Sequence, residues 1–248
     1  MACAEMATHL LIRLEGPLMA FGGETIDNLG VIRDFPAQSM LTGLIANALG
    51  WRREDATAHD RLQARVVFGA RLDRAGSRMR EYQTALLGMN DSGWTTSGLP
   101  EGREQSPSYR ADRTGRKVLT LQRYRDHHAD AAVLIALRLE PADETPTLDA
   151  VANALQRPAR PLFLGRKPCL PTAPLFAGWI DAPDVLTALR DAVPLAANAR
   201  PRVMWPAGEG EMPGARQIDL CDERNWTSGV HGGWRPVCEG NLKLEERT

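Results

Sequence analysis

The sequence lacks long apolar runs, paired cysteines and an overall excess of basic charge. Its apolar runs, such as residues 131–137, are far shorter than the ~20 residues that a membrane span needs. The N-terminus shows no signal pattern of basic and then apolar residues. We therefore expect a cytoplasmic protein that has no membrane partner. The cysteines form no C-x-x-C pair, so we expect reduced thiols and neither a zinc site nor a disulfide framework (Cys3, Cys169, Cys221, Cys238).

The charge balance at first argues against a nucleic-acid-binding protein, whose usual signature is an excess of Lys and Arg. The net charge is −1 and the pI is near 6.5. Basic residues are nevertheless concentrated locally: residues 108–125 hold six of them against one acid, and residues 157–167 hold four and no acid. Folding can bring two such segments together into a groove for phosphates. Solvated surface charge explains the charges alone equally well.

The first third of the chain has the pattern strand, helix, strand. Residues 9–14 predict a strand that ends at a Gly-Pro turn. Apolar residues recur at helical spacing over 40–49, after a proline suited to a first helical turn. A short polar helix is expected over 54–65 and a second strand over 66–72.

The remaining elements predict a second copy of this order after a long insertion. Residues from about 76 to 120 are rich in Gly, Ser, Pro and Arg, which is typical of a functional or disordered loop. A strand over 131–139, a helix over 148–155 and a short strand over 162–164 follow. The order matches an α+β, ferredoxin-like β-α-β-β-α-β domain, with helices on one face of the sheet and an open face that RNA-recognition domains use.

We therefore expect two regions. Residues 1–170 form the ferredoxin-like domain with its insertion, and residues 171–248 form a smaller β-rich C-terminal region. In that second region, a helix is expected over 184–192 and short strands over 217–220 and 237–238.

Six sets of residues carry a family resemblance. They are residues 10–17 with 19–22, residues 33–44, 80–84, 120–125 and 161–169, and a tail with Asp222, Arg224, Trp226 and His231. Together and in this order they resemble the CasD family of type I-E CRISPR Cascade, which belongs to the RAMP superfamily. The matched segments span nearly the whole chain.

The resemblance implies a function and a set of partners. It implies a non-catalytic subunit of a Cascade surveillance complex, which binds and caps the 5′ handle of the crRNA in antiviral defence. It implies that the insertion is the family's thumb, and that the partners are the backbone subunit CasC, the large subunit CasA and, through the complex, target DNA. We expect no cofactor and no metal, because the sequence holds no phosphate loop, dinucleotide fingerprint or carboxylate and histidine cluster.

Three segments supply candidate RNA contacts. The start of the helix after Pro36 offers backbone N–H groups and hydroxyls to a phosphate, with helix capping as the competing explanation. Tyrosines among arginines can stack on bases, although core packing is the usual place of Tyr. The Gly165 loop allows close approach to a phosphate, unless it is a simple turn. The predicted RNA-binding residues are Arg33, Gln38, Ser39, Thr42, Arg80, Tyr82, Tyr109, Arg110, Arg113, Arg116, Lys117, Arg123, Tyr124, Arg166, Lys167 and Arg224.

The strongest catalytic candidates are His127 and His128, which lie near Tyr124 and Lys117. Such groups can serve metal-independent RNA cleavage as a base and as cations for the developing charge. Adjacent residues of a strand point to opposite faces, so both histidines cannot easily serve one site. We expect exposed or capping histidines and no enzyme activity. The alternative is a metal-independent endoribonuclease that processes precursor crRNA.

Overall fold

A computed structural model of the chain describes residues 6–26, 28–88, 93–94, 100–101, 110–111, 113–115 and 117–244. These residues form two compact units. The first holds residues 1–22, 32–79 and 127–248, and the second holds residues 23–31 and 80–126. The first unit therefore crosses the boundary expected at residue 170. Whether the parts before and after that boundary fold separately stays a prediction.

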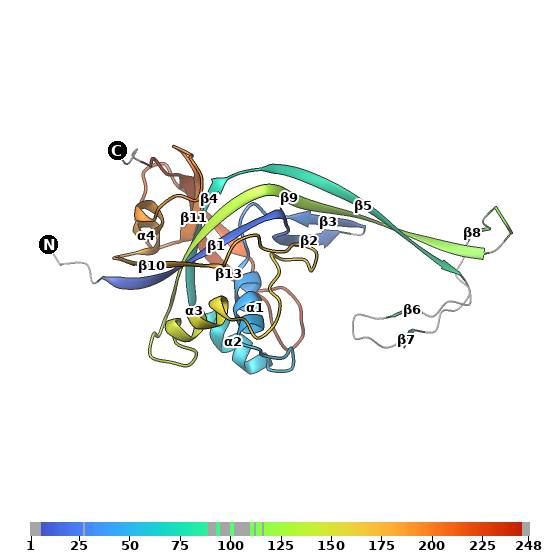
Figure 1. Ribbon diagram of the computed structural model, residues 1–248, viewed down its shortest axis with the longest axis horizontal. Helices are drawn as coiled ribbons and strands as arrows, with labels where there is room; N and C mark the ends of the chain where they lie inside the picture. The colour runs from blue at the N-terminus through green and yellow to red at the C-terminus, as the bar shows by residue number, and fades with distance from the viewer. Residues whose placement is uncertain are drawn as a thin grey trace. The chain divides into compact units, whose positions relative to one another are not determined.

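One antiparallel sheet is the centre of the first unit (Figure 1). Its strands lie in the order β10-β1-β9-β4-β11-β13-β12. Their bounds are β10 (Phe176–Ala182), β1 (Ala7–Met19), β9 (Lys117–Leu139), β4 (Val66–Arg74), β11 (Arg202–Pro206), β13 (Trp234–Asn241) and β12 (Arg216–Cys221). Each neighbouring pair on this path is antiparallel. The expected C-terminal strands are thus confirmed, and they extend the main sheet through β4 and β11.

Helices cover both faces of this sheet (Figure 1). They are α1 (Gln38–Ala48), α2 (Ala56–Arg65), α3 (Leu148–Gln156) and α4 (Val185–Asp191). Leu10, Ile12 and Leu14 of β1 pack with α1, α2 and α3, whereas Leu11 belongs to a second core with α4. This alternation is what a strand requires when both its faces are buried. The sheet face that we expected to be open is therefore packed against α4.

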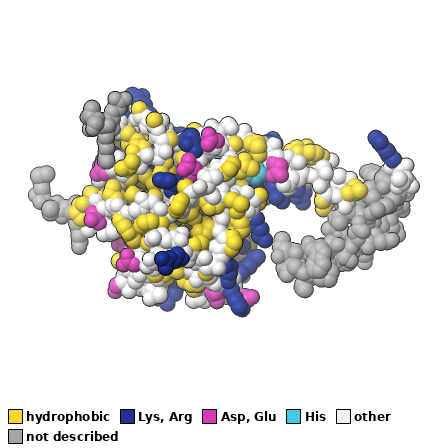
Figure 2. All heavy atoms as spheres, viewed as in Figure 1, with side chains coloured by type: hydrophobic (Ala, Val, Ile, Leu, Met, Phe, Trp, Pro, Cys, Tyr) yellow, Lys and Arg dark blue, Asp and Glu magenta, His cyan; other side chains and the backbone are white. Residues whose placement is uncertain are grey.

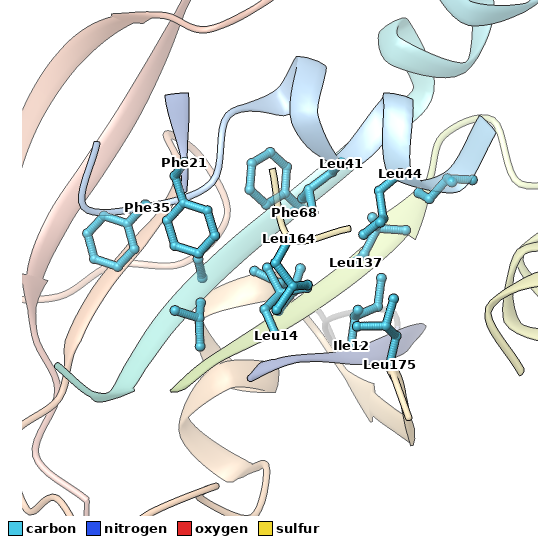
Figure 3. Close-up of a cluster of buried hydrophobic side chains, with 14 of the residues drawn as sticks. Ile12, Leu14, Phe21, Phe35, Leu41, Leu44, Phe68, Leu137, Leu164 and Leu175 are labelled. Atoms are coloured by element: carbon cyan, nitrogen blue, oxygen red, sulfur yellow. The ribbon is translucent and has the colours of Figure 1, made fainter. Parts of the chain in front are cut away.

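The larger core lies between the sheet and α1 (Figure 3). Phe68 of β4, Leu137 of β9 and Leu41 of α1 are fully buried there. Leu164 lies in the same cluster, but residues 162–164 do not form the strand that we expected. The backbone groups of Leu164 bond to Ala20 and Cys169 instead of a sheet ladder. The apolar run reflects a core-facing loop, and the next strand along the chain is β10.

The second unit is built on long strands. β5 (Ser77–Gly88) pairs with β9, and β3 (Leu29–Ile32) pairs in parallel with β9 at Tyr124 and Arg125. Short strands complete the set: β2 (Gly22–Ile26), which pairs with β3, β6 (Gly93–Trp94) with β7 (Pro100–Glu101), and β8 (Arg110–Ala111) with β9. The expected insertion is therefore partly regular sheet, because β5 and the first part of β9 pair with each other.

Candidate nucleic-acid interface

The second unit carries a pair of tyrosines, of which Tyr82 is exposed and Tyr124 is half-buried. Tyr82 of β5 and Tyr124 of β9 have ring centroids 5.0 Å apart at an interplanar angle of 33°. Tyr82 is 53% exposed. Since a strand places alternate residues on one face, Arg80 lies on the same face as Tyr82, and Asp126 on the same face as Tyr124. Arg80, Tyr82, Tyr124 and Asp126 are called the tyrosine platform below.

An ion pair holds the charged side chain of Arg80 in the tyrosine platform. The guanidinium of Arg80 makes two hydrogen bonds to Asp126, at 2.7 and 3.2 Å. This carboxylate raises the pKa of Arg80. Arg123 is exposed, but it precedes Tyr124 by one residue and so lies on the opposite face of β9. The platform thus offers a planar guanidinium beside two aromatic rings, all of which are possible stacking partners for bases.

The start of α1 does not offer free donors to a ligand. The backbone N–H of Gln38 donates to Asp222 Oδ2 at 3.0 Å, and that of Ser39 donates to the Asp222 carbonyl at 3.0 Å. The Thr42 hydroxyl donates to the Gln38 carbonyl at 2.9 Å. The side chains of Gln38, Ser39 and Thr42 are all buried. Capping therefore accounts for this helix start, and the residue that provides it, Asp222, was not singled out for that role from the sequence.

Arg33 and the Gly165 loop also have structural partners. Arg33 Nη2 donates to the Cys221 carbonyl at 2.8 Å. Gly165 has φ +96°, and a Cβ there would stand on the Ala20 carbonyl. Arg166 is half-buried, with Nη1 3.4 Å from His127 Nε2, whereas Lys167 is exposed. The close approach to the Ala20 backbone explains why a glycine is needed at position 165. In this loop, Lys167 is the exposed cation.

The other predicted contacts are distributed over both units. Arg224 lies in the first unit, with its guanidinium 5.3 Å from the Trp226 ring. Arg113 is exposed in the second unit. Tyr109 and Arg116 lie outside the described residues, and for Arg110 and Lys117 only the strand backbone is described. Their RNA contacts stay predictions. On the body formed by the first unit, Lys and Arg are interspersed with acidic and apolar side chains over the visible face (Figure 2).

Both candidate catalytic histidines are buried, contrary to the exposed positions we expected. His127 is 1% exposed and His128 5%. The His128 Nε2–H donates to the Arg33 carbonyl at 2.8 Å, and its ring lies 5.2 Å from that of Phe21. Burial lowers the pKa of His128, and the smaller effect of the Arg33 carbonyl opposes it. These positions favour a packing role.

This burial predicts a loss of stability in mild acid. The unfolded chain takes up a proton at His128 near the ordinary pKa of 6.5, while the folded chain does so only at lower pH. The stability that depends on a neutral His128 is therefore fully present above pH 6.5. It is lost as the pH falls towards the pKa of His128 in the folded chain. Urea unfolding across this range should show a shallower pH slope for His128→Gln. The exposed His231→Gln is the control, and an equal slope in all three proteins would contradict the expectation.

Two further searches concern metals and membranes. Among the residues that the structure describes, no group of three or more His, Cys, Asp or Glu is placed to hold a metal ion. None of the helices in the described part is long and apolar enough to cross a membrane.

The fold is that of CRISPR-associated proteins. It is similar to a chain of a solved "CRISPR RNA-guided surveillance complex", with a TM-score of 0.68 and 23% identity over 95% of this chain and 90% of that one. It is also similar to a solved "Cas protein", with a TM-score of 0.55 and 24% identity over 96% and 95% of the two chains.

The chain belongs to the family described as CRISPR-associated protein (Cas_Cas5), whose model matches residues 9–238. It is 30% identical over 193 residues to the CRISPR system Cascade subunit CasD of Escherichia coli (strain K12). The aligned residues cover 78% of this chain and 80% of that protein. The resemblance found in the sequence motifs is thereby confirmed.

Proposed function

We propose that this chain is the CasD-type subunit of a Cascade surveillance complex, and that it caps the 5′ handle of the crRNA without cleaving RNA. The similarity to CasD over four-fifths of that protein supports membership of such a complex. The partners would then be CasC, CasA and, through the complex, target DNA, and the complex would act in the cytoplasm.

The strand order supports a ferredoxin-like RAMP core as part of this proposal. Four neighbouring antiparallel strands lie in the order β10-β1-β9-β4. Along the chain, α1 precedes β4 and α3 lies between β9 and β10, and both helices pack in the same core. This connectivity supports a β-α-β-β-α-β domain. The second unit, with β5 and the first part of β9, would then be the thumb.

The single observation that carries the RNA-binding part is the tyrosine platform. Aromatic rings usually pack in the core. Tyr82 and Tyr124 instead contact each other in the second unit, where Tyr82 is exposed. Arg80 lies beside them with its charge held by Asp126. Such a surface binds unpaired bases by stacking and leaves their sequence to other contacts.

The proposal includes the absence of catalysis. A general base must reach the 2′-hydroxyl of its substrate within hydrogen-bonding distance. The rings of His127 and His128 are enclosed, and His128 already donates its Nε2–H to a backbone carbonyl. The endoribonuclease alternative therefore has no accessible histidine at these two positions.

Removal of either platform ring should weaken RNA retention. Each stacked base contributes about 1–3 kcal/mol, so Tyr82→Ala and Tyr124→Ala should each reduce retention roughly tenfold. The measurement is co-purification with partner subunits, followed by extraction and sequencing of the bound RNA. Leu86→Ala, which removes another exposed side chain of β5, is the matched control.

Two outcomes would contradict the proposal. Tyrosine variants that retain as much handle-bearing RNA as Leu86→Ala would exclude the platform as the contact. Specific cleavage of repeat RNA by the purified chain in the presence of a chelator would exclude the non-catalytic role.

A further inference from the structure

A cavity in the first unit gathers cations and aromatic rings, and none of its lining residues belongs to the tyrosine platform. It has a volume of about 300 Å³. Its walls come from α1, the loop between α1 and α2, α2 itself, the segment between α3 and β10, and the segment between β12 and β13. Among the described residues that line it, three are arginines and none is acidic.

Two of these arginines are held close together. Arg224 Nη2 and Arg53 Nη2 lie 3.0 and 3.5 Å from the position that a Cβ on Gly229 would take. Burial and, to a smaller extent, the charge of Arg53 lower the pKa of Arg224. The Arg224 Nε is buried without a hydrogen-bond partner among the described residues. The Trp226 ring, 5.3 Å from the Arg224 guanidinium, offsets part of this repulsion, and an anion between the two arginines would offset more of it.

Asp55 and Asp60, at the start of α2 and within it, do not neutralise this pair. Asp60 Oδ1 accepts a hydrogen bond from the Trp226 backbone N–H at 3.4 Å. Asp55 Oδ2 accepts one from the Arg52 backbone N–H at 2.7 Å. Both carboxylates thus cap the backbone, and neither makes an ion pair with the two cavity guanidiniums.

The remaining wall is aromatic and rigid. The His59 ring lies 4.5 Å from that of Trp226 and 5.6 Å from that of Trp51. Gln63 Oε1 accepts hydrogen bonds from the Trp226 indole N–H and the Arg224 backbone N–H, both at 3.1 Å. These bonds fix Trp226 and Arg224 to α2 before any ligand arrives. A preformed wall of this kind lowers the ordering cost of binding.

A third arginine stiffens the rim of the cavity. Arg160 Nη1 donates to the Trp51 carbonyl at 2.6 Å, and its Nη2 donates to the Gly50 carbonyl at 2.9 Å. Its guanidinium is thereby fixed, and it adds positive charge to the cavity. The field in the cavity therefore favours an anion.

We propose that this cavity binds a nucleotide, whose phosphate lies on the guanidiniums of Arg53 and Arg224 and whose base lies against the aromatic wall. Arginine matches the geometry of phosphate oxygens with paired N–H donors. Aromatic and guanidinium planes stack on a base. A simple carboxylate ligand has no base and would leave the aromatic wall unused. The cavity volume suits one nucleotide, which is either free in solution or part of a strand. This inference uses no residue of the tyrosine platform, so it can fail while the proposed function holds; if the nucleotide is part of an RNA strand, the inference rests on that function.

The test is titration of the purified full chain, followed by tryptophan fluorescence, because Trp51 and Trp226 line the cavity. The probes are AMP, inorganic phosphate and a short single-stranded RNA. AMP should bind more tightly than phosphate, and added salt should weaken binding. Arg53→Ala should weaken it about tenfold, since one charged hydrogen-bonding partner is lost.

Two comparisons separate this cavity from other effects. Arg52→Ala removes an exposed cation from the same loop outside the cavity and should bind AMP as the parent does. Loss of AMP binding in Arg53→Ala is read from the cavity tryptophans, whereas loss of RNA retention is read in Tyr82→Ala, so the two proposals can fail separately. Binding of RNA but not AMP, with loss in Arg53→Ala, would support the proposal and assign the nucleotide to a strand.

Three results would overturn the proposal. They are measurable binding of AMP and of inorganic phosphate with equal affinity, no binding of any probe, and binding that Arg53→Ala leaves unchanged. Preference for a glutamate-rich peptide over AMP would likewise overturn it and assign the cavity to a protein partner.

Discussion

Asp222→Ala should destabilise the protein by roughly 3–5 kcal/mol, because it removes one partner of a buried ion pair and leaves the other uncompensated. Asp222 is 1% exposed. Its carboxylate accepts hydrogen bonds from Arg235 at 2.9 and 2.8 Å and from the Gln38 N–H at 3.0 Å. One side chain therefore stabilises the start of α1 and fixes a guanidinium that lies 4.7 Å from the Phe68 ring.

Urea unfolding measures this effect. Asp222→Asn retains one carbonyl oxygen as an acceptor and should lose less stability than the alanine variant. Asp219→Ala, an exposed carboxylate of β12 three residues before Asp222, is the matched control and should change stability by about 0.5 kcal/mol or less. An equal, small loss at both positions would show that Asp222 does not hold the helix.

Gly165→Ala should also destabilise the protein, by about 3–5 kcal/mol. At φ +96° a side chain strains the backbone, and the new Cβ would meet the Ala20 carbonyl oxygen. That carbonyl cannot easily move away, because the Ala20 N–H donates to the Leu164 carbonyl at 3.0 Å. The substitution would push the loop away from β1 and disturb the core around Leu164.

Thermal unfolding followed by circular dichroism tests this expectation. Gly22→Ala is the control, because among the described residues no atom apart from its chain neighbours lies within 4 Å of a Cβ at that glycine. The control should unfold within about 0.5 kcal/mol of the parent. A Gly165→Ala protein of parental stability would mean that the loop can retreat from Ala20 without loss.

The elements that the sequence predicted well are those with a local pattern. Strand β1, helices α1 and α3 and the buried part of β9 each have apolar residues at the spacing of their own secondary structure. Residues 162–164 show the limit of such patterns, because burial and not strand pairing selects their apolar side chains. Periodicity alone does not separate a short buried strand from a buried loop.

The candidate site was only partly predictable for a related reason. The sequence identified Tyr82 and Tyr124 singly, as tyrosines among arginines, but only the pairing of β5 with β9 brings the rings together. It also nominated Ser39 and Thr42, whose positions suit a phosphate site as well as a cap. The deciding fact was the position of Asp222, far along the chain.

By itself the sequence determined the family, through six sets of residues in order, and most of the elements, through residue spacing that acts within one turn or strand. Tertiary structure alone decided which polar groups are available to a ligand. Asp222 occupies the start of α1, whereas Arg53 and Arg224 meet at a cavity with no acidic lining among its described residues. The physical reason is that hydrogen bonds and charges act over a few ångströms in space, and residues far apart in the chain become neighbours only when the core packs.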